Sequence, residues 1–245
     1  MFAKNNYLLD TINMKTTNVE PSQLNYDRYT SDKYDKDIVN SIPFHREIHN
    51  LIVDFVKTNY KKEEKQDVLD LGVGTAITSR LIKDVLPNAN FDLVDFSKQM
   101  FKGAKEKMGS ENVKYISGDY SKLKFTKKYD IVVCVIGLHH QNNAGKQKMF
   151  KKIYSLLKLN GVFIFADLVT YRDQKEAALN QAKHFKNLVD KTEDDKTLSE
   201  WAYHHLYLND LAPIEDQIKW LKDDGFKVKK DFLKINTTLL ICHKN

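Results

Sequence analysis

The sequence predicts an α/β fold, a doubly wound sheet of seven strands that is mostly parallel and closes with an antiparallel hairpin. From residue 67 onward, apolar runs of strand length alternate with segments of helical periodicity, as in β-α-β units. The runs are apolar almost throughout, as expected of parallel strands that helices cover on both faces. The last two runs, 226–234 and 236–243, are joined too tightly for a parallel crossover, so they must pair antiparallel.

Composition narrows the class of protein and its partners. The chain has 245 residues, 42% hydrophobic and 29% charged, enough for one sizeable core. Its net charge of +6 comes mainly from lysines spread over many segments, which indicates a solvated surface; RNA as a partner stays possible but is not favoured. No apolar run approaches the ~20 residues of a membrane span and no signal peptide is visible, so we expect a cytoplasmic protein. Cys134 and Cys242 lie in apolar runs and should be buried, reduced thiols.

The first 60 residues are predicted to form a leader and a helical cap ahead of the main domain at 61–245. Aromatic and charged residues interleave between 24 and 46, and a helix with one apolar face follows over about 44–60. Tyr26 and Tyr34 either line a site at the mouth of the main domain or anchor the leader to it. The sequence leaves both interpretations open.

The first strand ends in a glycine-rich turn, within DVLDLGVGT at 67–75. Gly72 and Gly74 allow a tight turn that brings bare backbone close to a ligand. Thr75 is a candidate cap for the helix that follows, whose free N–H groups point back to the turn. The third glycine of a dinucleotide-binding turn would fall on Ile77, so the turn argues against that class of cofactor.

Acidic residues follow the next two predicted strands. Strand 91–97 ends at Asp95, about 20 residues beyond the glycine turn, where a β-α-β unit places a carboxylate for the hydroxyls of a ribose. After a helix at about 98–107, strand 113–117 leads into Gly118-Asp119-Tyr120. Because the carboxyl ends of parallel strands meet at one edge of the sheet, the pattern predicts a nucleoside site there. Helix capping is the structural alternative, for Asp119 more than for Asp95.

The most apolar run, 129–137, is predicted to be the central strand, and it opens into His139 and His140. An imidazole titrates near neutral pH, so both are candidate general bases, His140 ahead of His139. The alternative is that one of them only packs against a cofactor. A helix at about 145–157, a left-handed stop at Leu159-Asn160-Gly161 and a fifth strand at 161–169 come next.

A mostly helical insertion at about 170–212 departs from the alternating pattern and is predicted to form a lid. Its end contains Tyr203, His204 and Tyr207, candidates for substrate contact. No Asp, Glu or Cys stands at ligand spacing from His204 and its neighbour His205, so no metal site is expected. Pro213 then begins a helix that runs to about Asp224.

These motifs resemble those of the class I S-adenosylmethionine-dependent methyltransferases, from about Asp67 to the C-terminus. The marks are VLDLGVGT, LVDFS, GDY, KLNGVFIFAD and the closing hairpin. The leader YDKDIVNSIPFHREIHNLI and the tail NTTLL are also similar to the branch that contains carboxy-S-adenosylmethionine synthase and related small-molecule methyltransferases. The resemblance implies a Rossmann-like fold, S-adenosylmethionine as cofactor and S-adenosylhomocysteine as product. The chain departs from the usual GxGxG turn in having Ala76 where the third glycine stands.

The resemblance also implies roles for individual residues. The glycine turn and the backbone near Asp70 would hold the methionine part of the cofactor. Asp95 would bind the two ribose hydroxyls, and Asp119 with Tyr120 the adenine. The remaining expected cofactor contacts are Phe96 and Met100, which would flank the ring, together with Thr75, Gly118, Val135 and Tyr26. The candidates on the substrate side are Tyr34, Arg46 and the lid residues Tyr203, His204 and Tyr207.

The expected function is methyl transfer from S-adenosylmethionine to an oxygen or nitrogen atom of a small molecule, because a lidded pocket suits a small acceptor. One alternative is an enzyme like carboxy-S-adenosylmethionine synthase, or another tRNA-modification enzyme; Arg28 or Arg46 would then pair the extra carboxylate. The other is a non-catalytic S-adenosylmethionine-binding module. The sequence does not indicate the methyl acceptor or the oligomeric state.

Overall fold

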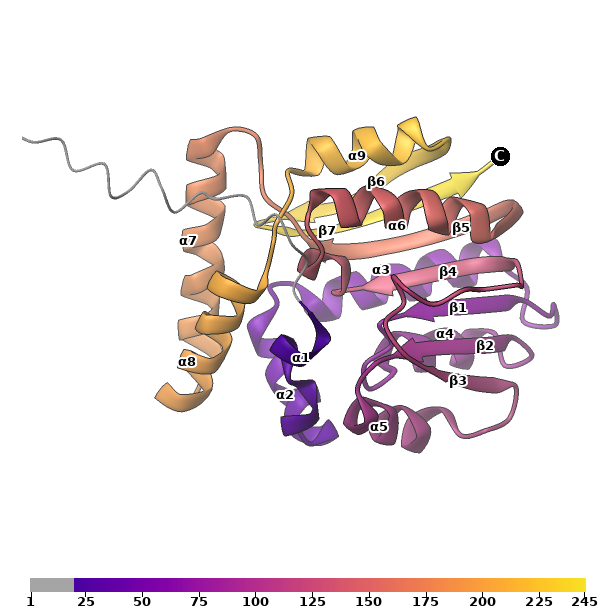
Figure 1. Ribbon diagram of the computed structural model, residues 1–245, viewed down its shortest axis with the longest axis horizontal. Helices are drawn as coiled ribbons and strands as arrows, with labels where there is room; N and C mark the ends of the chain where they lie inside the picture. The colour runs from indigo at the N-terminus through magenta and orange to yellow at the C-terminus, as the bar shows by residue number, and fades with distance from the viewer. Residues whose placement is uncertain (1–19) are drawn as a thin grey trace, which may run out of the picture.

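The computed structural model describes residues 20–245, and the structural statements below refer to them. They form a mixed seven-stranded sheet with helices on both faces (Figure 1). The strand order is β3-β2-β1-β4-β5-β7-β6, and the pairs that include β7 are antiparallel while the others are parallel, which confirms the predicted fold class. The strands are β1 (Asp67–Leu71), β2 (Asn90–Asp95), β3 (Val113–Ser117), β4 (Tyr129–Val135), β5 (Leu157–Leu168), β6 (Phe226–Lys234) and β7 (Thr237–Lys244).

Two core clusters lie on opposite faces of the sheet. Helices α3, α4 and α5 pack on one face, and α6 and α9 on the other. Alternate residues of β4 contribute to each cluster, so this strand must be apolar almost throughout. The helices are α1 (Pro21–Leu24), η2 (Tyr26–Arg28), α2 (Ser31–Ser41), α3 (His45–Asn59), α4 (Ile77–Val85), α5 (Lys98–Met108), η3 (Leu138–His140), α6 (Asn143–Leu156), α7 (Gln174–Lys191), α8 (Asp195–Tyr203), the π-helix η4 (His204–Leu208) and α9 (Ile214–Asp223).

The N-terminal helices and the insertion lie together at the carboxyl ends of the parallel strands (Figure 1). A third cluster joins them, in which Ile38 of α2 and Ile42, just after that helix, pack with Leu168, Leu188 and Trp201. Helix α3 belongs instead to the core of the sheet, through Ile48, Ile52 and Val56. The domain boundary near residue 60 and the role of the insertion as a lid stay predictions.

Two local features differ from the sequence expectation. Thr75 does not cap α4, because its hydroxyl donates to the carboxylate of Asp35 (2.5 Å); the residue at the cap is Ala76, in the left-handed region at φ 64°. Asn160 has the predicted left-handed backbone at φ 61°, but it does not stop α6, which ends at Leu156. It lies in β5, where the pairing with β4 shifts register and the strand bulges.

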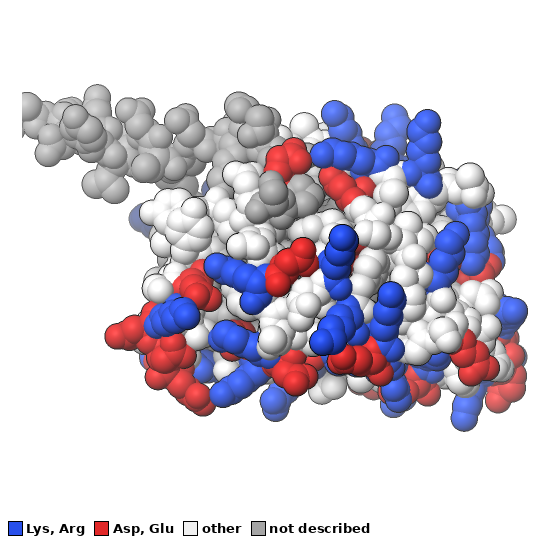
Figure 2. Space-filling view, turned by 60° about the horizontal axis from the view of Figure 1, so that its bottom comes forward, with Lys and Arg blue, Asp and Glu red and all other residues white. Residues whose placement is uncertain are grey.

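The distribution of surface charges and the burial of the two cysteines match the expectations from composition. Figure 2 shows lysine and arginine side chains interspersed with acidic ones on the face in view. Cys134 and Cys242 are buried and unbridged, as predicted. Within residues 20–245, no helix combines the length and the apolar character needed to cross a bilayer.

Candidate functional site

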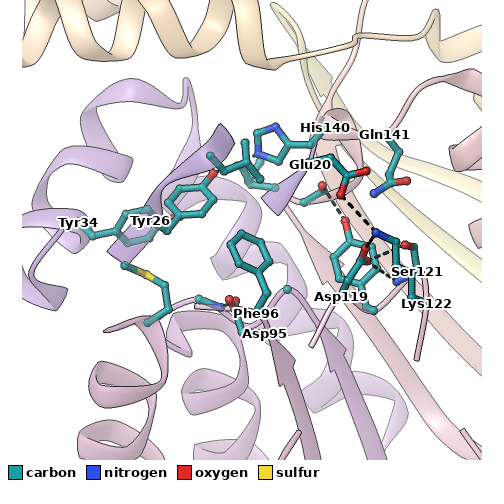
Figure 3. A pocket seen from close by; sticks show the side chains of 17 residues that line it. Glu20, Tyr26, Tyr34, Asp95, Phe96, Asp119, Ser121, Lys122, His140 and Gln141 are labelled. Atoms are coloured by element: carbon teal, nitrogen blue, oxygen red, sulfur yellow. Dashed lines mark hydrogen bonds and ion pairs between the residues drawn. The ribbon is translucent and has the colours of Figure 1, made fainter. Parts of the chain in front are cut away.

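The main pocket lies at the carboxyl ends of β1, β2 and β4, under the N-terminal helices (Figure 3). Side chains from α1, η2 and α2 meet there with the glycine turn and with the loops after β2, β3 and β4. The lining residues are Glu20, Leu24, Tyr26, Tyr34, Gly72, Gly74, Asp95, Phe96, Met100, Asp119, Tyr120, Ser121, Lys122, Ile136, Gly137, His140 and Gln141. The structure thus brings most of the predicted cofactor contacts into one cavity.

The turn after β1 presents its backbone to this pocket. Gly72 (φ 77°) and Gly74 (φ 55°) adopt the left-handed conformation that residues with a Cβ atom disfavour. A Cβ atom on Gly72 would lie 3.5 Å from the ring of Tyr120, and one on Gly74 would lie 4.0 Å from the ring of Tyr34. The glycines therefore keep the turn tight and leave its backbone accessible from the pocket.

Asp95 ends β2 with its carboxylate turned toward the glycine turn. Oδ2 accepts a hydrogen bond from the N–H of Gly74, and Oδ1 accepts one from the N–H of Ser97, both at 2.8 Å. The residue is only 6% exposed, and burial raises the pKa of its carboxyl to about 6. Because each carboxylate oxygen has a second lone pair, Asp95 can still accept hydrogen bonds from a diol in the pocket.

The loop after β3 supplies the second acidic residue. Oδ1 of Asp119 accepts hydrogen bonds from the N–H (2.8 Å) and the hydroxyl (2.6 Å) of Ser121, and Oδ2 lies 3.4 Å from Nζ of Lys122. The hydroxyl of Tyr120 donates to the carbonyl oxygen of Gly137 at 3.0 Å, which ties this loop to the end of β4. Asp119 therefore orders its own loop, in which it caps no helix, and also lines the pocket.

The two histidines after β4 have different environments. His140 lines the pocket, with Nδ1 3.0 Å from the carbonyl oxygen of Leu208 and Nε2 3.1 Å from the hydroxyl of Tyr26. Burial lowers the pKa of His140 well below its usual value, so its ring is neutral. His139 lies outside the pocket, with Nδ1 2.5 Å from Oδ1 of the buried Asp167. Of the two predicted bases, only His140 faces the pocket.

A second pocket adjoins the first, which it meets at Tyr34, Gly72, Gly74 and Ile136. It also contains Thr75 and Val135, two predicted cofactor contacts, together with His45 and His49. Nδ1 of His49 donates to the carbonyl oxygen of His45 (2.7 Å), and its Nε2 lies 3.0 Å from the hydroxyl of Thr78. Sequence reasoning missed these histidines, although their spacing of four residues puts both on the apolar face of α3.

Ile136 holds an unusual backbone conformation where the two pockets meet. Its φ of 54° lies in the left-handed region, which a β-branched residue rarely adopts. Its N–H donates to the carbonyl oxygen of Ala166 (2.8 Å), so the pairing of β4 with β5 holds the residue in place. Such strain concentrates at binding sites.

Two predicted cofactor residues lie outside both pockets. Asp70 is 2% exposed, and its carboxyl accepts a hydrogen bond from the hydroxyl of Ser79 on α4 (2.6 Å). Burial raises the pKa of this carboxyl to about 7. Gly118 adopts φ 147° beside the side chain of Leu123. Both residues shape the loops around the main pocket without lining it.

Some of the candidates for substrate contact line a pocket and others do not. Tyr34 lines both pockets, whereas Arg46 is exposed on α3. Tyr203 and Tyr207 lie on the outer surface, 57% and 60% exposed. Their ring centroids are 5.0 Å apart, because residues four apart lie on the same face of a helix. His204 lies between them in sequence but is buried, with its ring centroid 5.1 Å from that of His140.

Comparisons with known proteins find methyltransferases and related enzymes among the proteins similar to this chain. Residues 68–161 match a family described as a methyltransferase domain. The chain is 32% identical over 184 residues to malonyl-(acyl-carrier protein) O-methyltransferase 2 of Ilyobacter polytropus, a match that covers 71% of this chain and 64% of that protein. It is 26% identical over 235 residues to carboxy-S-adenosyl-L-methionine synthase of Helicobacter pylori, covering 89% and 93%. The fold is similar to that in the DhpI-SAM-HEP complex, with a TM-score of 0.63 and 18% identity over 90% of this chain and 95% of that one.

Proposed function

We propose that this chain, a member of the class I S-adenosylmethionine-dependent methyltransferases, transfers a methyl group to an oxygen or nitrogen atom of a small-molecule acceptor. Its cofactor is S-adenosylmethionine, as the motifs implied. The observation that carries the choice of acceptor is the cover over the pocket, to which Tyr26 of η2 and Tyr34 of α2 contribute (Figure 3). A covered pocket suits a small acceptor better than a polymer.

The residues in the main pocket fit this cofactor. Asp95 would accept hydrogen bonds from the ribose hydroxyls, and the left-handed turn of Gly72 and Gly74 would present bare backbone to the methionine part. Phe96 and Met100 provide apolar contacts for an adenine ring. When bound, the cofactor supplies a methyl group already activated by the positive sulfur. The chain itself orients the acceptor and excludes water from the reacting atoms.

His140 is the proposed acceptor of a proton where the substrate must lose one. Its Nδ1 faces a carbonyl oxygen, which can only accept, so Nδ1 carries the hydrogen and Nε2 the lone pair. Nε2 is directed at the hydroxyl of Tyr26 inside the pocket. A substrate hydroxyl that took the place of the Tyr26 hydroxyl would face this nitrogen.

A second candidate function is that of the carboxy-S-adenosylmethionine synthases, because the match to the Helicobacter pylori synthase covers 93% of that protein. An extra carboxylate on the cofactor needs a cation beside it. In the described part of the chain, the only lysine or arginine that lines either pocket is Lys122, and it already pairs with Glu20 and Asp119. Arg28 and Arg46, the predicted cations, are exposed and outside both pockets. This observation favours simple methyl transfer.

A binding and turnover experiment tests the proposal. The purified chain is titrated calorimetrically with S-adenosylmethionine and with NAD, then incubated with S-adenosylmethionine and a panel of small carboxylic acids, phenols and amines, with bulk tRNA for comparison. We expect binding of S-adenosylmethionine but not of NAD, and formation of S-adenosylhomocysteine with a small acceptor. Mass spectrometry of the purified protein for carboxy-S-adenosylmethionine distinguishes the second candidate. Binding without turnover on any acceptor would favour a non-catalytic module, and no binding at millimolar concentration would refute both enzymatic functions.

A further inference from the structure

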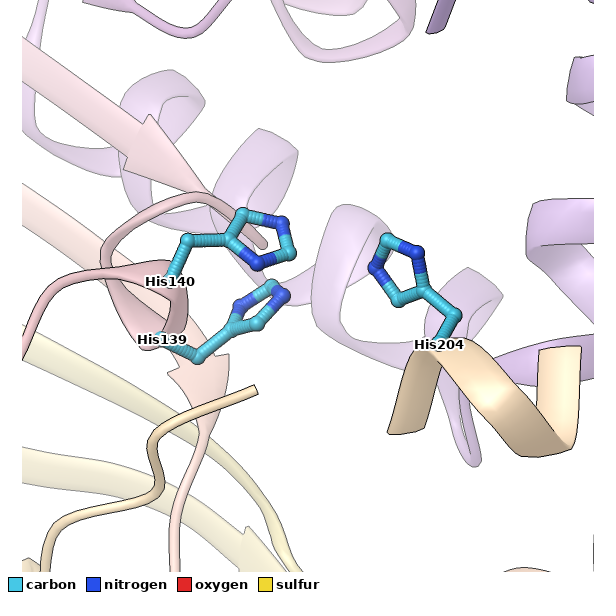
Figure 4. A group of neighbouring side chains, drawn as sticks. All are labelled: His139, His140 and His204. Atoms are coloured by element: carbon cyan, nitrogen blue, oxygen red, sulfur yellow. The ribbon is translucent and has the colours of Figure 1, made fainter. Parts of the chain in front are cut away.

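We propose that His139, His140 and His204 form a site for one divalent metal ion of the zinc class beside the cofactor pocket (Figure 4). One ring nitrogen from each histidine lies within 4.8 Å of the corresponding nitrogens of the other two. All three side chains are buried, at 2–5% exposure. The site does not depend on the proposed methyl transfer.

The hydrogen bonds of His139 and His140 are those of metal-binding histidines. In His139, Nδ1 faces Oδ1 of Asp167 (2.5 Å), and in His140 it faces the carbonyl oxygen of Leu208 (3.0 Å). Both partners are acceptors, so Nδ1 carries the hydrogen in each ring and Nε2 is the ligand atom. A carboxylate or a carbonyl behind the second nitrogen is the usual outer partner of a metal-bound histidine, because it fixes the ring and raises its basicity.

The segments that carry the three histidines are held together independently of any metal. Leu208, the partner of His140, ends the same π-helix η4 that begins at His204. Beyond it, the N–H of Asp210 donates to the carbonyl oxygen of His139 at 2.7 Å. The buried Lys146 donates to the carbonyl oxygens of Gln141 and Asp210 and so links both segments. π-helices of this kind often occur at functional sites.

The donor set selects the class of metal. Three imidazole nitrogens suit Zn²⁺, Co²⁺, Ni²⁺ or Cu²⁺, whereas Mg²⁺ and Ca²⁺ prefer oxygen ligands. Zinc–nitrogen bonds of about 2.0–2.1 Å require the three nitrogens to close in on the ion, and His204 approaches from the insertion opposite the other two (Figure 4). His140 and Tyr26 line the main pocket, so a fourth position next to them would be open to a water or to an oxygen of a bound molecule. With metal bound, His140 is a ligand and no longer the proposed base.

This set of three histidines could not be predicted from the sequence. The expectation of no metal site rested on ligand spacing within the insertion, whereas two of these ligands follow β4 and the third lies at the far end of the insertion. The cluster exists only because η4 folds back onto η3.

The test uses the full chain, stripped of metal by a chelator, and titration with Zn²⁺ alone or Co²⁺ alone. We expect one ion per chain and, for Co²⁺, the visible absorption of a nitrogen-ligated four-coordinate ion. His204→Ala should weaken Zn²⁺ binding by more than about 100-fold, since loss of only an outer partner costs about 10–100-fold. Asp167→Asn, which changes only the outer partner of His139, should weaken Zn²⁺ binding by about 10–100-fold. His243→Ala, a partly exposed histidine on β7 outside the cluster, is the matched control and should bind like the parent.

The site would be overturned by a parent that binds neither Zn²⁺ nor Co²⁺, or by parental affinity in His204→Ala. Loss of binding in His49→Ala instead would also overturn it, because it would place the ion at the His45–His49 pair. Circular dichroism of the metal-free variants separates loss of a ligand from loss of the fold. If His204→Ala does not fold, His140→Gln, which preserves more of the side-chain volume, should show the same loss of Zn²⁺ and of the Co²⁺ absorption. Parental binding by that variant would equally overturn the site.

Discussion

Replacing Asp95 with Asn is expected to weaken the binding of S-adenosylhomocysteine by roughly 30- to 1000-fold. A charge-assisted hydrogen bond contributes about 1.5–3 kcal/mol, and two bonds to one diol are not fully additive, so the loss should be about 2–4 kcal/mol. Each 1.4 kcal/mol corresponds to about tenfold in affinity. The variant also leaves one of the N–H groups of Gly74 and Ser97 without its carboxylate acceptor, which loosens the turn that faces the cofactor.

Calorimetric titration of the two proteins measures this effect, and Asp92→Asn is the control. Asp92 lies on the same strand and is also buried, but its carboxylate accepts from the hydroxyl of Tyr129 and does not line the pocket. The Asp92→Asn variant should bind S-adenosylhomocysteine with the affinity of the parent. Asp95 is buried, so unfolding curves of both variants are needed as well. Parental affinity in a folded Asp95→Asn variant would remove Asp95 from the cofactor site.

Replacing Asp70 with Asn is expected to stabilise the empty protein above pH 7 and to have little effect near pH 4. The pKa of this carboxyl is raised from 3.8 to about 7 in the folded chain, so the folded state holds the proton more tightly than the unfolded state does. Stability conferred by the protonated form is therefore lost as pH rises from about 4 through 7. At 1.36 kcal/mol per pKa unit, discounted for relaxation of the buried site, the parent should lose about 1–3 kcal/mol that the variant keeps.

Urea unfolding at pH 5 and pH 8 tests this expectation. The difference in unfolding free energy between Asp70→Asn and the parent should grow in favour of the variant at pH 8. Asparagine still offers an oxygen to the hydroxyl of Ser79, so the contact between β1 and α4 is retained. A difference that is the same at both pH values would show that Asp70 does not carry this pH dependence.

The sheet and the main pocket could be predicted because short stretches of sequence, each read on its own, indicate the strands and the turns that form them. Apolar runs, glycines and strand-end carboxylates follow one another in the order in which a doubly wound sheet uses them, so Gly72, Gly74 and Asp95 were found from spacing alone. The direction of the Asp70 carboxyl could not be predicted, because position along a strand does not reveal that this side chain contacts Ser79 of α4.

Contacts between distant segments could not be predicted in this way. Nothing in the sequence around His204 indicates that it meets His140, or that Tyr26 reaches the same ring from the leader. A weak indication did exist for Asp167, an acidic residue inside the apolar run FIFADLV, since a carboxylate buried in a strand needs a partner. Tyr203 and Tyr207 are exposed on the insertion, and their role in substrate contact stays a prediction.

The most direct test of the cofactor site is a crystal structure of the chain with S-adenosylhomocysteine. We expect the ribose hydroxyls to lie within hydrogen-bond distance of the Asp95 carboxylate, the adenine between Phe96 and the loop of Asp119, and the homocysteine against the turn of Gly72 and Gly74. An adenosine bound elsewhere, or one whose ribose makes no contact with Asp95, would contradict the account.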